Sequence, residues 1–272
     1  MQLDTRRSFL QASLLTGFAL AVQPVMASTI QTDAAGLDTG WVKIGELPAF
    51  QARPNNASGP LPTIIVIQEI FGVHEHIQDL CRRLAKLGYL AIAPELFFRQ
   101  GDPRTFTDVN LLIKELVSQV PDAQVMKDLD AVAAWAAQNG GDPARLAVTG
   151  FCWGGRITWL YAAHNPKVAA SAAWYGRLTG APSANNPVHP VDIAKQLKSP
   201  VLGLYAGKDQ GISLESVEQM RQALKRQAQP FKLVIYDEAG HGFNADYRPN
   251  FHPAAAQDGW KTMLAWFKQF GV

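Results

Sequence analysis

From about residue 60 onward, short apolar runs alternate with stretches in which apolar residues recur at helical spacing. Residues 62–69 are Pro-Thr-Ile-Ile-Val-Ile-Gln-Glu, a run typical of a strand that is buried on both faces. Similar runs occupy residues 89–94, 145–150, 168–175, 201–206 and 231–236. Helical patterns occupy residues 77–87, 125–136, 217–224 and 260–267. Repeated strand–helix units predict an α/β protein with a mostly parallel central sheet flanked by helices on both faces.

Two loop-rich stretches, residues 99–120 and 178–189, interrupt this alternation. Each follows the predicted carboxyl end of a strand, which is where parallel sheets bind ligands. We find no internal repeat and no second domain, so residues 28–272 are predicted to form a single domain. The net charge of +2, without a block of lysine or arginine, argues against a nucleic-acid or membrane-surface partner.

The first 27 residues carry the pattern of an export signal. Thr-Arg-Arg-Ser-Phe-Leu at residues 5–10 resembles the twin-arginine signature, and Val-Met-Ala at residues 25–27 resembles a cleavage site. The apolar stretch between them, residues 14–22, is shorter than the roughly 20 residues that span a bilayer. We therefore expect export by the twin-arginine machinery to the periplasm or beyond, with a mature protein that is not embedded in the membrane. An N-terminal membrane anchor or a frayed helix is the alternative.

The chain has two cysteines. Cys81 shares a helical face with Ile77, Leu80 and Leu84, so it is predicted to be a small core residue. Cys152 is expected at the end of a strand, whereas Cys81 lies more than a turn along its helix. A disulfide requires Cα atoms within about 7 Å, so pairing is not expected.

The most informative stretch is Gly-Phe-Cys-Trp-Gly-Gly at residues 150–155. It matches the nucleophile elbow of the α/β-hydrolase fold with cysteine in place of serine, between a predicted strand and a predicted helix. The turn is so sharp that only small side chains fit at Gly150 and Gly154. The helix that follows directs its positive end at the Cys152 sulfur, which favours the thiolate. The alternative is a glycine-rich turn with an incidental cysteine.

Partners for Cys152 follow in the order that this fold uses, first an acid and then a base. Asp209 follows the strand at residues 201–206, and His241 follows the strand at residues 231–236. The imidazole can accept the thiol proton, and the carboxylate can orient the ring. Asp192 and Asp237 compete for the acid role; a helix-capping role suffices for Asp192, and Asp237 lies too close to its strand.

The remaining histidines give weaker signals. His74 and His76 suggest a metal pair, but no third ligand follows, so a solvated helix start is predicted. His164, His189 and His252 are interpreted as surface or loop residues. We predict no metal and no cofactor.

The chain resembles the dienelactone hydrolase family over roughly residues 40–272. The similarity rests on Gln-Glu-Ile-Phe-Gly at residues 68–72, the turn at residues 150–155, Trp-Tyr-Gly at residues 174–176, Gly-Lys-Asp at residues 207–209 and Ala-Gly-His-Gly-Phe at residues 239–243. The resemblance implies a carboxymethylenebutenolidase-like hydrolase of small esters or lactones. It also implies that Glu69 holds the resting Cys152 as a neutral thiol and moves aside when substrate binds.

The resemblance extends to further site residues. It implies an oxyanion hole made by the backbone N–H groups of Trp153 and Ile70. Members of the family bind a substrate carboxylate with two arginines. Arg248 is a candidate for one of them, although its spacing from His241 is longer than the family pattern; Arg177 and Tyr175 are further candidates for substrate binding. This departure puts a true dienelactone substrate in doubt.

The leading hypothesis is therefore a hydrolase acting through a thioacyl-enzyme. A non-catalytic periplasmic small-molecule-binding protein on the same fold is the alternative, and intact Cys152, Asp209 and His241 argue against it. A redox protein would need a resolving cysteine, and Cys81 is poorly placed for that role.

Overall fold

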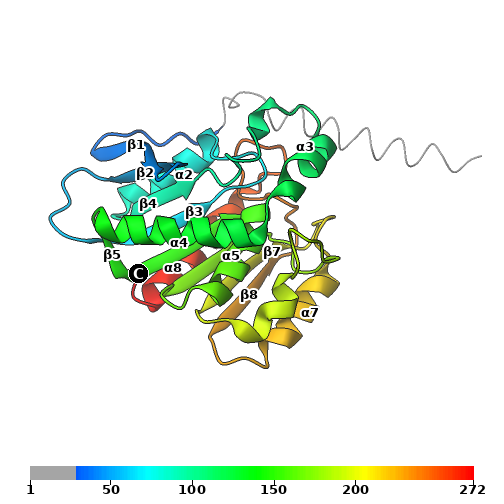
Figure 1. Ribbon diagram of the computed structural model, residues 1–272. Helices are drawn as coiled ribbons and strands as arrows, with labels where there is room; N and C mark the ends of the chain where they lie inside the picture. Colours follow the sequence, from blue (N-terminus) through cyan, green and yellow to red (C-terminus); the bar gives the residue numbers. More distant parts are fainter. Residues whose placement is uncertain (1–28) are drawn as a thin grey trace, which may run out of the picture.

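The centre of the molecule is a twisted sheet in the order β1-β2-β4-β3-β5-β6-β7-β8 (Figure 1). The computed structural model describes residues 29–272, so the predicted signal at residues 1–27 lies outside the described residues. The strands are β1 Leu37–Ile44, β2 Leu47–Pro54, β3 Leu61–Ile67, β4 Leu90–Pro94, β5 Gly141–Phe151, β6 Ala170–Trp174, β7 Val201–Ala206 and β8 Phe231–Tyr236. Six strands are parallel to one another: β4, β3, β5, β6, β7 and β8. The strands β1 and β2 are antiparallel to their neighbours.

Helices cover both faces of this sheet. Figure 1 shows α4 and α5 in front of the strands and α8 behind them. The helices are α2 Glu75–Lys86, α3 Val109–Glu115, α4 Asp122–Gln138, α5 Trp153–His164, α6 Pro190–Ile193, α7 Leu214–Leu224 and α8 Pro253–Gln269. In β4 and β6 every residue is buried, as strands covered on both faces require. The predicted fold class is confirmed.

Two differences from the predicted elements have local causes. The hairpin β1–β2 was not predicted, because β1 lies at the edge of the sheet and is partly exposed along its length. Its two-residue connection contains Gly45 at φ +61°, a conformation that suits a hairpin turn. Both residues 99–120 and residues 178–189 were expected to be loop-rich. The first stretch contains α3 and two 3-10 turns, whereas the second holds no helix or strand. Asp108 begins α3 by accepting hydrogen bonds from the N–H groups of Asn110 and Leu111.

The register of the parallel strands brings their carboxyl ends together at one end of the sheet. Ile67 pairs with Gly150, Phe151 pairs with Trp174, and Ala206 pairs with Tyr236. The residues that directly follow β3, β5, β6, β7 and β8 are therefore neighbours, although they come from five parts of the chain. No helix within residues 29–272 is long and apolar enough to cross a membrane.

Candidate active site

Cys152 occupies a strained turn between β5 and α5. Its φ of 56° and ψ of −113° lie outside the regions that most residues adopt. Close backbone packing explains the flanking glycines, since a Cβ at Gly150 would lie 2.2 Å from the carbonyl oxygen of Gly154. A Cβ at Gly154 would lie 2.4 Å from the carbonyl oxygen of Gln68. The turn thus packs closely against the end of β3.

The structure brings Cys152, His241 and Asp209 together. The Sγ atom of Cys152 lies 3.3 Å from Nε2 of His241, and Nδ1 of the same ring lies 2.8 Å from Oδ2 of Asp209. The Asp209 side chain is 1% exposed, whereas that of His241 is 30% exposed. Oδ1 of Asp209 accepts hydrogen bonds from the N–H groups of Gly211 and Ile212, which fix the carboxylate. This is the geometry of a nucleophile, a base and an orienting acid.

The electrostatics of these residues favour a protonated imidazole. Burial alone would lower the pKa of His241, but the Cys152 sulfur and the hydrogen bond with Asp209 raise it to about 10. An imidazole with a raised pKa retains a proton taken from a neighbouring thiol. The arrangement therefore places a cation beside the Cys152 sulfur.

The competing acids have other roles. Oδ2 of Asp192 accepts a hydrogen bond from the N–H of His189, so it caps the short helix α6 from within its first turn. The backbone of Asp237 packs against Gly207, close to the end of β8. Neither carboxylate forms a hydrogen bond or an ion pair with His241.

The two backbone N–H groups expected to form an oxyanion hole belong to residues that follow neighbouring strands. Trp153 is the first residue of α5, and the first N–H groups of a helix have no partner inside it. Ile70 lies three residues beyond Ile67, which pairs with Gly150, so its backbone follows the neighbouring strand at the same edge. Both residues are half-buried. Their positions suit donors to an oxygen bound next to the sulfur.

Glu69 is buried at the same ends of the strands, but its side chain contacts Tyr247 and His74. Its side chain is 1% exposed, and Oε2 accepts a hydrogen bond of 2.6 Å from the hydroxyl group of Tyr247. The same oxygen lies 3.5 Å from Nε2 of His74. Burial alone would raise the pKa of Glu69, but the contact with His74 and the positive charge of Arg248 lower it well below its ordinary value. Glu69 is therefore an anion at neutral pH.

The three candidate substrate-binding residues are placed differently. Tyr175 is fully buried at φ 37°, its ring centroid lies 5.3 Å from that of His241, and its hydroxyl group has no partner among the described residues. The guanidinium of Arg248 lies 5.6 Å from the ring centroid of Phe71, close enough to Glu69 to influence its pKa. Arg177 is exposed and contacts no other site residue that the structure describes. The structure therefore gathers Tyr175 and Arg248 at the site but leaves Arg177 outside it.

The prediction of a solvated helix start at His74 and His76 is wrong. His76 is 3% exposed, and its Nδ1 lies 3.3 Å from Oδ1 of Asp246. The His74 side chain is 19% exposed and contacts Glu69 and the ring of Tyr247. The sequence offered little sign of Tyr247, apart from its position directly before Arg248. Within residues 29–272, no three metal-binding side chains form a cluster.

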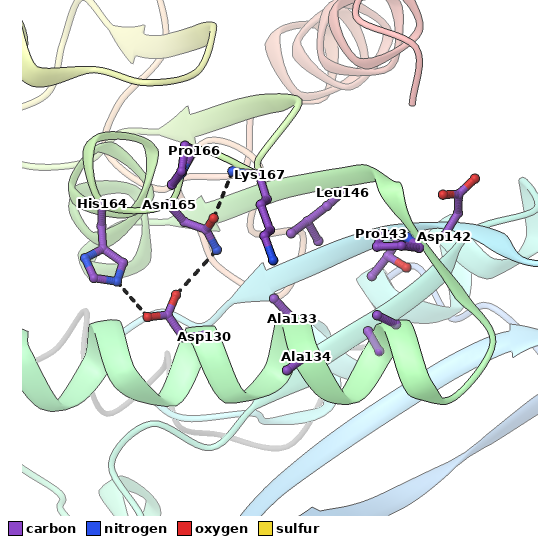
Figure 2. A pocket seen from close by; sticks show the side chains of 13 residues that line it. Asp130, Ala133, Ala134, Asp142, Pro143, Leu146, His164, Asn165, Pro166 and Lys167 are labelled. Atoms are coloured by element: carbon purple, nitrogen blue, oxygen red, sulfur yellow. Dashed lines mark hydrogen bonds and ion pairs between the residues drawn. The ribbon is translucent and has the colours of Figure 1, made fainter.

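A hollow of about 340 Å³ lies near the amino-terminal ends of β3 and β5, opposite the end at which Cys152 lies (Figure 2). Thr63 near the start of β3 and Leu146 of β5 line it, together with residues of α4 and the end of α5. On its rim, Oδ2 of Asp130 lies 2.7 Å from Nε2 of His164. This hollow is separate from Cys152, which lies beyond the carboxyl end of β5. The other cysteine, Cys81, is fully buried, and neither cysteine forms a disulfide.

Comparisons with known proteins give matches over most of the chain. The model of the "Dienelactone hydrolase family" matches residues 47–271. A protein of Escherichia coli (strain K12) named "Putative carboxymethylenebutenolidase" is 57% identical over 260 residues, which cover 94% of this chain and 96% of that protein. A Methylorubrum extorquens protein of the same name is 59% identical over 274 residues, which cover 98% of this chain and 94% of that protein. The crystal structure of "Putative Dienelactone Hydrolase" from Klebsiella pneumoniae has a TM-score of 0.85 and 62% identity, covering 86% of this chain and 99% of that one.

Proposed function

The chain belongs to the dienelactone hydrolase family, and from this premise we propose that it hydrolyses a small ester or lactone with Cys152 as its nucleophile. The observation that carries the proposal is the 3.3 Å contact between the Cys152 sulfur and His241, whose ring is held by Asp209 at 2.8 Å. A hydrolase of this family needs a nucleophile next to a base, and these residues supply both.

The proposed reaction has two halves. His241 takes the proton of Cys152, and the thiolate attacks the substrate carbonyl carbon to form a tetrahedral intermediate with a negatively charged oxygen. The N–H groups of Trp153 and Ile70 stabilise that oxygen. The intermediate collapses, the bond to the leaving alkoxide oxygen breaks, His241 protonates this oxygen, and a thioacyl-enzyme remains. His241 then removes a proton from water, which attacks the thioester, and the sulfur leaves to regenerate the enzyme.

We further propose that the substrate bears a negative charge. The guanidinium of Arg248 lies 5.6 Å from the ring centroid of Phe71, and the charge of Glu69 raises its pKa although burial alone would lower it. Such a cation suits a substrate carboxylate. Tyr175, whose buried hydroxyl group has no described partner, is a second candidate contact. Glu69 is proposed to govern the protonation of Cys152.

Replacing the nucleophile tests the proposal. Cys152→Ala should lower the turnover of activated short-chain carboxylic esters at least about 10³-fold, because no sulfur remains to form the acyl-enzyme. Turnover is measured by release of a chromogenic alcohol, and Cys81→Ala is the matched control that should retain activity. Wild-type rates in Cys152→Ala would contradict the proposal. If the unaltered protein binds esters and lactones but cleaves none of them, a non-catalytic binding protein is favoured.

We propose that the protein is exported by the twin-arginine machinery and acts in the periplasm or outside the cell. The support is the Arg-Arg pair at residues 6–7, the apolar stretch at residues 14–22 and the cleavage-site pattern at residues 25–27. The hydrolase domain would then be residues 28–272.

A further inference from the structure

The carboxylate of Glu69 is held on one side only. Its Oε2 atom accepts a 2.6 Å hydrogen bond from Tyr247, whereas Oε1 is buried without a hydrogen-bond partner among the described residues. The 3.5 Å contact with His74 is long for a hydrogen bond, so the Tyr247 hydroxyl group is the principal partner. Burial raises the pKa of Tyr247 well above its ordinary value, which keeps this hydroxyl group a donor.

Tyr247 is itself held in place from two sides. Its ring lies 4.9 Å from that of His74 and 5.1 Å from that of His76, both at the start of α2. Its neighbour Asp246 is 5% exposed and binds Arg83 of α2 at 2.5 Å. These contacts fasten the segment after His241 to α2, so the Tyr247 hydroxyl group has a defined position.

Glu69 and Cys152 are neighbours across two strand ends. Ile67 pairs with Gly150 in the parallel ladder, and Glu69 and Cys152 each lie two residues further along the chain, just beyond the ends of β3 and β5. Adjacent strands are about 4.8 Å apart. The turn at Cys152 also packs against the chain next to Glu69, since Gly154 lies against the carbonyl oxygen of Gln68. A Glu69 carboxylate released from Tyr247 is therefore within side-chain reach of the thiol.

We propose that Tyr247 is a positioning residue that holds Glu69 away from Cys152 and so leaves the sulfur to His241. This inference rests on the proposed roles of Cys152 and Glu69. With the phenol in place, the buried carboxylate has a strong donor and the sulfur pairs with the imidazole. Without it, the carboxylate is free to turn toward the Cys152 thiol and accept its hydrogen. The sulfur is then held as a neutral, poorly nucleophilic thiol.

The rate of alkylation of Cys152 by iodoacetamide at pH 7 tests this role without any substrate. Tyr247→Phe should slow alkylation about tenfold, in keeping with the loss of one hydrogen bond to a charged group. The double variant Tyr247→Phe/Glu69→Gln should restore the rate, because the neutral amide cannot hold the thiol as the carboxylate does. Labelling at Cys152 is read by peptide mass spectrometry, and folding is checked by circular dichroism.

A matched control is Tyr236→Phe, which removes a 2.8 Å hydrogen bond from a tyrosine to Asp258 elsewhere in the chain and should not change the rate. An unchanged or faster rate in Tyr247→Phe would overturn the inference, as would slow alkylation that Glu69→Gln does not relieve. His74→Ala is a second test and should cause a smaller slowing that the same Glu69→Gln change removes. Because no ester is involved, these outcomes are independent of whether Cys152→Ala abolishes hydrolysis.

Discussion

At the scale of single residues, the two cysteines of this protein have opposite environments. Cys81 is fully buried on α2, and burial raises the pKa of its thiol well above the ordinary value. Cys152 is half-buried at the start of α5 and contacts the imidazole of His241. We therefore expect the thiol to be inert at position 81 and reactive at position 152. The difference comes from neighbouring charges and from access to solvent.

This contrast predicts selective alkylation of Cys152 that persists in mild acid. With a pKa raised to about 10, His241 stays protonated throughout the neutral range, so lowering the pH from 8 to 6 does not remove the cation beside the sulfur. Alkylation of Cys152 should fall less than about fivefold over this range, whereas an ordinary thiol would lose roughly 70-fold. Mass spectrometry of iodoacetamide-treated protein measures both cysteines.

Labelling of Cys81 should be more than about 100-fold slower than that of Cys152 at every pH tested. His241→Ala is the control variant. If it leaves the pH dependence of Cys152 labelling unchanged, the imidazole does not support the thiolate.

At the scale of secondary-structure elements, an ion pair joins the two helices in front of the sheet. Arg156 of α5 binds both carboxylate oxygens of Asp122, the first residue of α4, at 2.7 Å. The side chains are 6% and 10% exposed. Arg156 also donates to the carbonyl oxygen of Val188, and Asp122 accepts from Asn186, so the loop at residues 178–189 is fastened to both helices. Helix α5, which begins directly after Cys152, and the loop expected to border the site are thus held by one buried charge pair.

Removing one member of this pair should destabilise the fold. Asp122→Ala leaves the Arg156 guanidinium buried without its counter-charge and should lower the free energy of unfolding by about 3–5 kcal/mol. Urea denaturation followed by circular dichroism measures the change. The matched control is Asp142→Ala, which removes a more exposed ion pair with Arg145 and should cost less than about 1 kcal/mol. Equal losses in both variants would show that burial of the pair is unimportant.

At the scale of the whole molecule, the site exists only when the sheet is complete. Cys152, Asp209 and His241 follow three different strands, and Glu69 follows a fourth. A protein assembled in this way suits the twin-arginine machinery, which carries proteins that are already folded. The proposed destination and the proposed site are therefore compatible, because the triad can form before export.

The export proposal predicts a change in location when the arginine pair is replaced. Arg6→Lys/Arg7→Lys should move the protein from the periplasmic to the cytoplasmic fraction, because the signature recognised by the machinery is lost. Cell fractionation with immunodetection measures this, and Arg226→Lys in the hydrolase domain is the control that should not change location. Periplasmic recovery of the double variant would contradict the proposal. Retention of the unaltered protein in the membrane fraction would favour an N-terminal anchor.

The sequence by itself determined the features that depend on local pattern. Apolar runs and helical spacing identified the six parallel strands and the principal helices, because each element must present a continuous apolar face to the core. The small residues around Cys152 marked the elbow, since a sharp turn excludes larger side chains wherever it occurs. The order of acid and base along the chain then pointed to Asp209 and His241, which the structure brings together with the sulfur.

Only the tertiary structure decided how distant side chains share one buried space. Tyr247 meets Glu69 across 178 residues, and His76, which was expected in solvent, is buried against Asp246. Arg177 follows Tyr175 by two residues, yet it points to solvent while the tyrosine is buried. No local pattern encodes such outcomes, because the direction of a side chain beyond a strand depends on which elements pack over it. The partner of Glu69 is therefore a property of the folded chain as a whole.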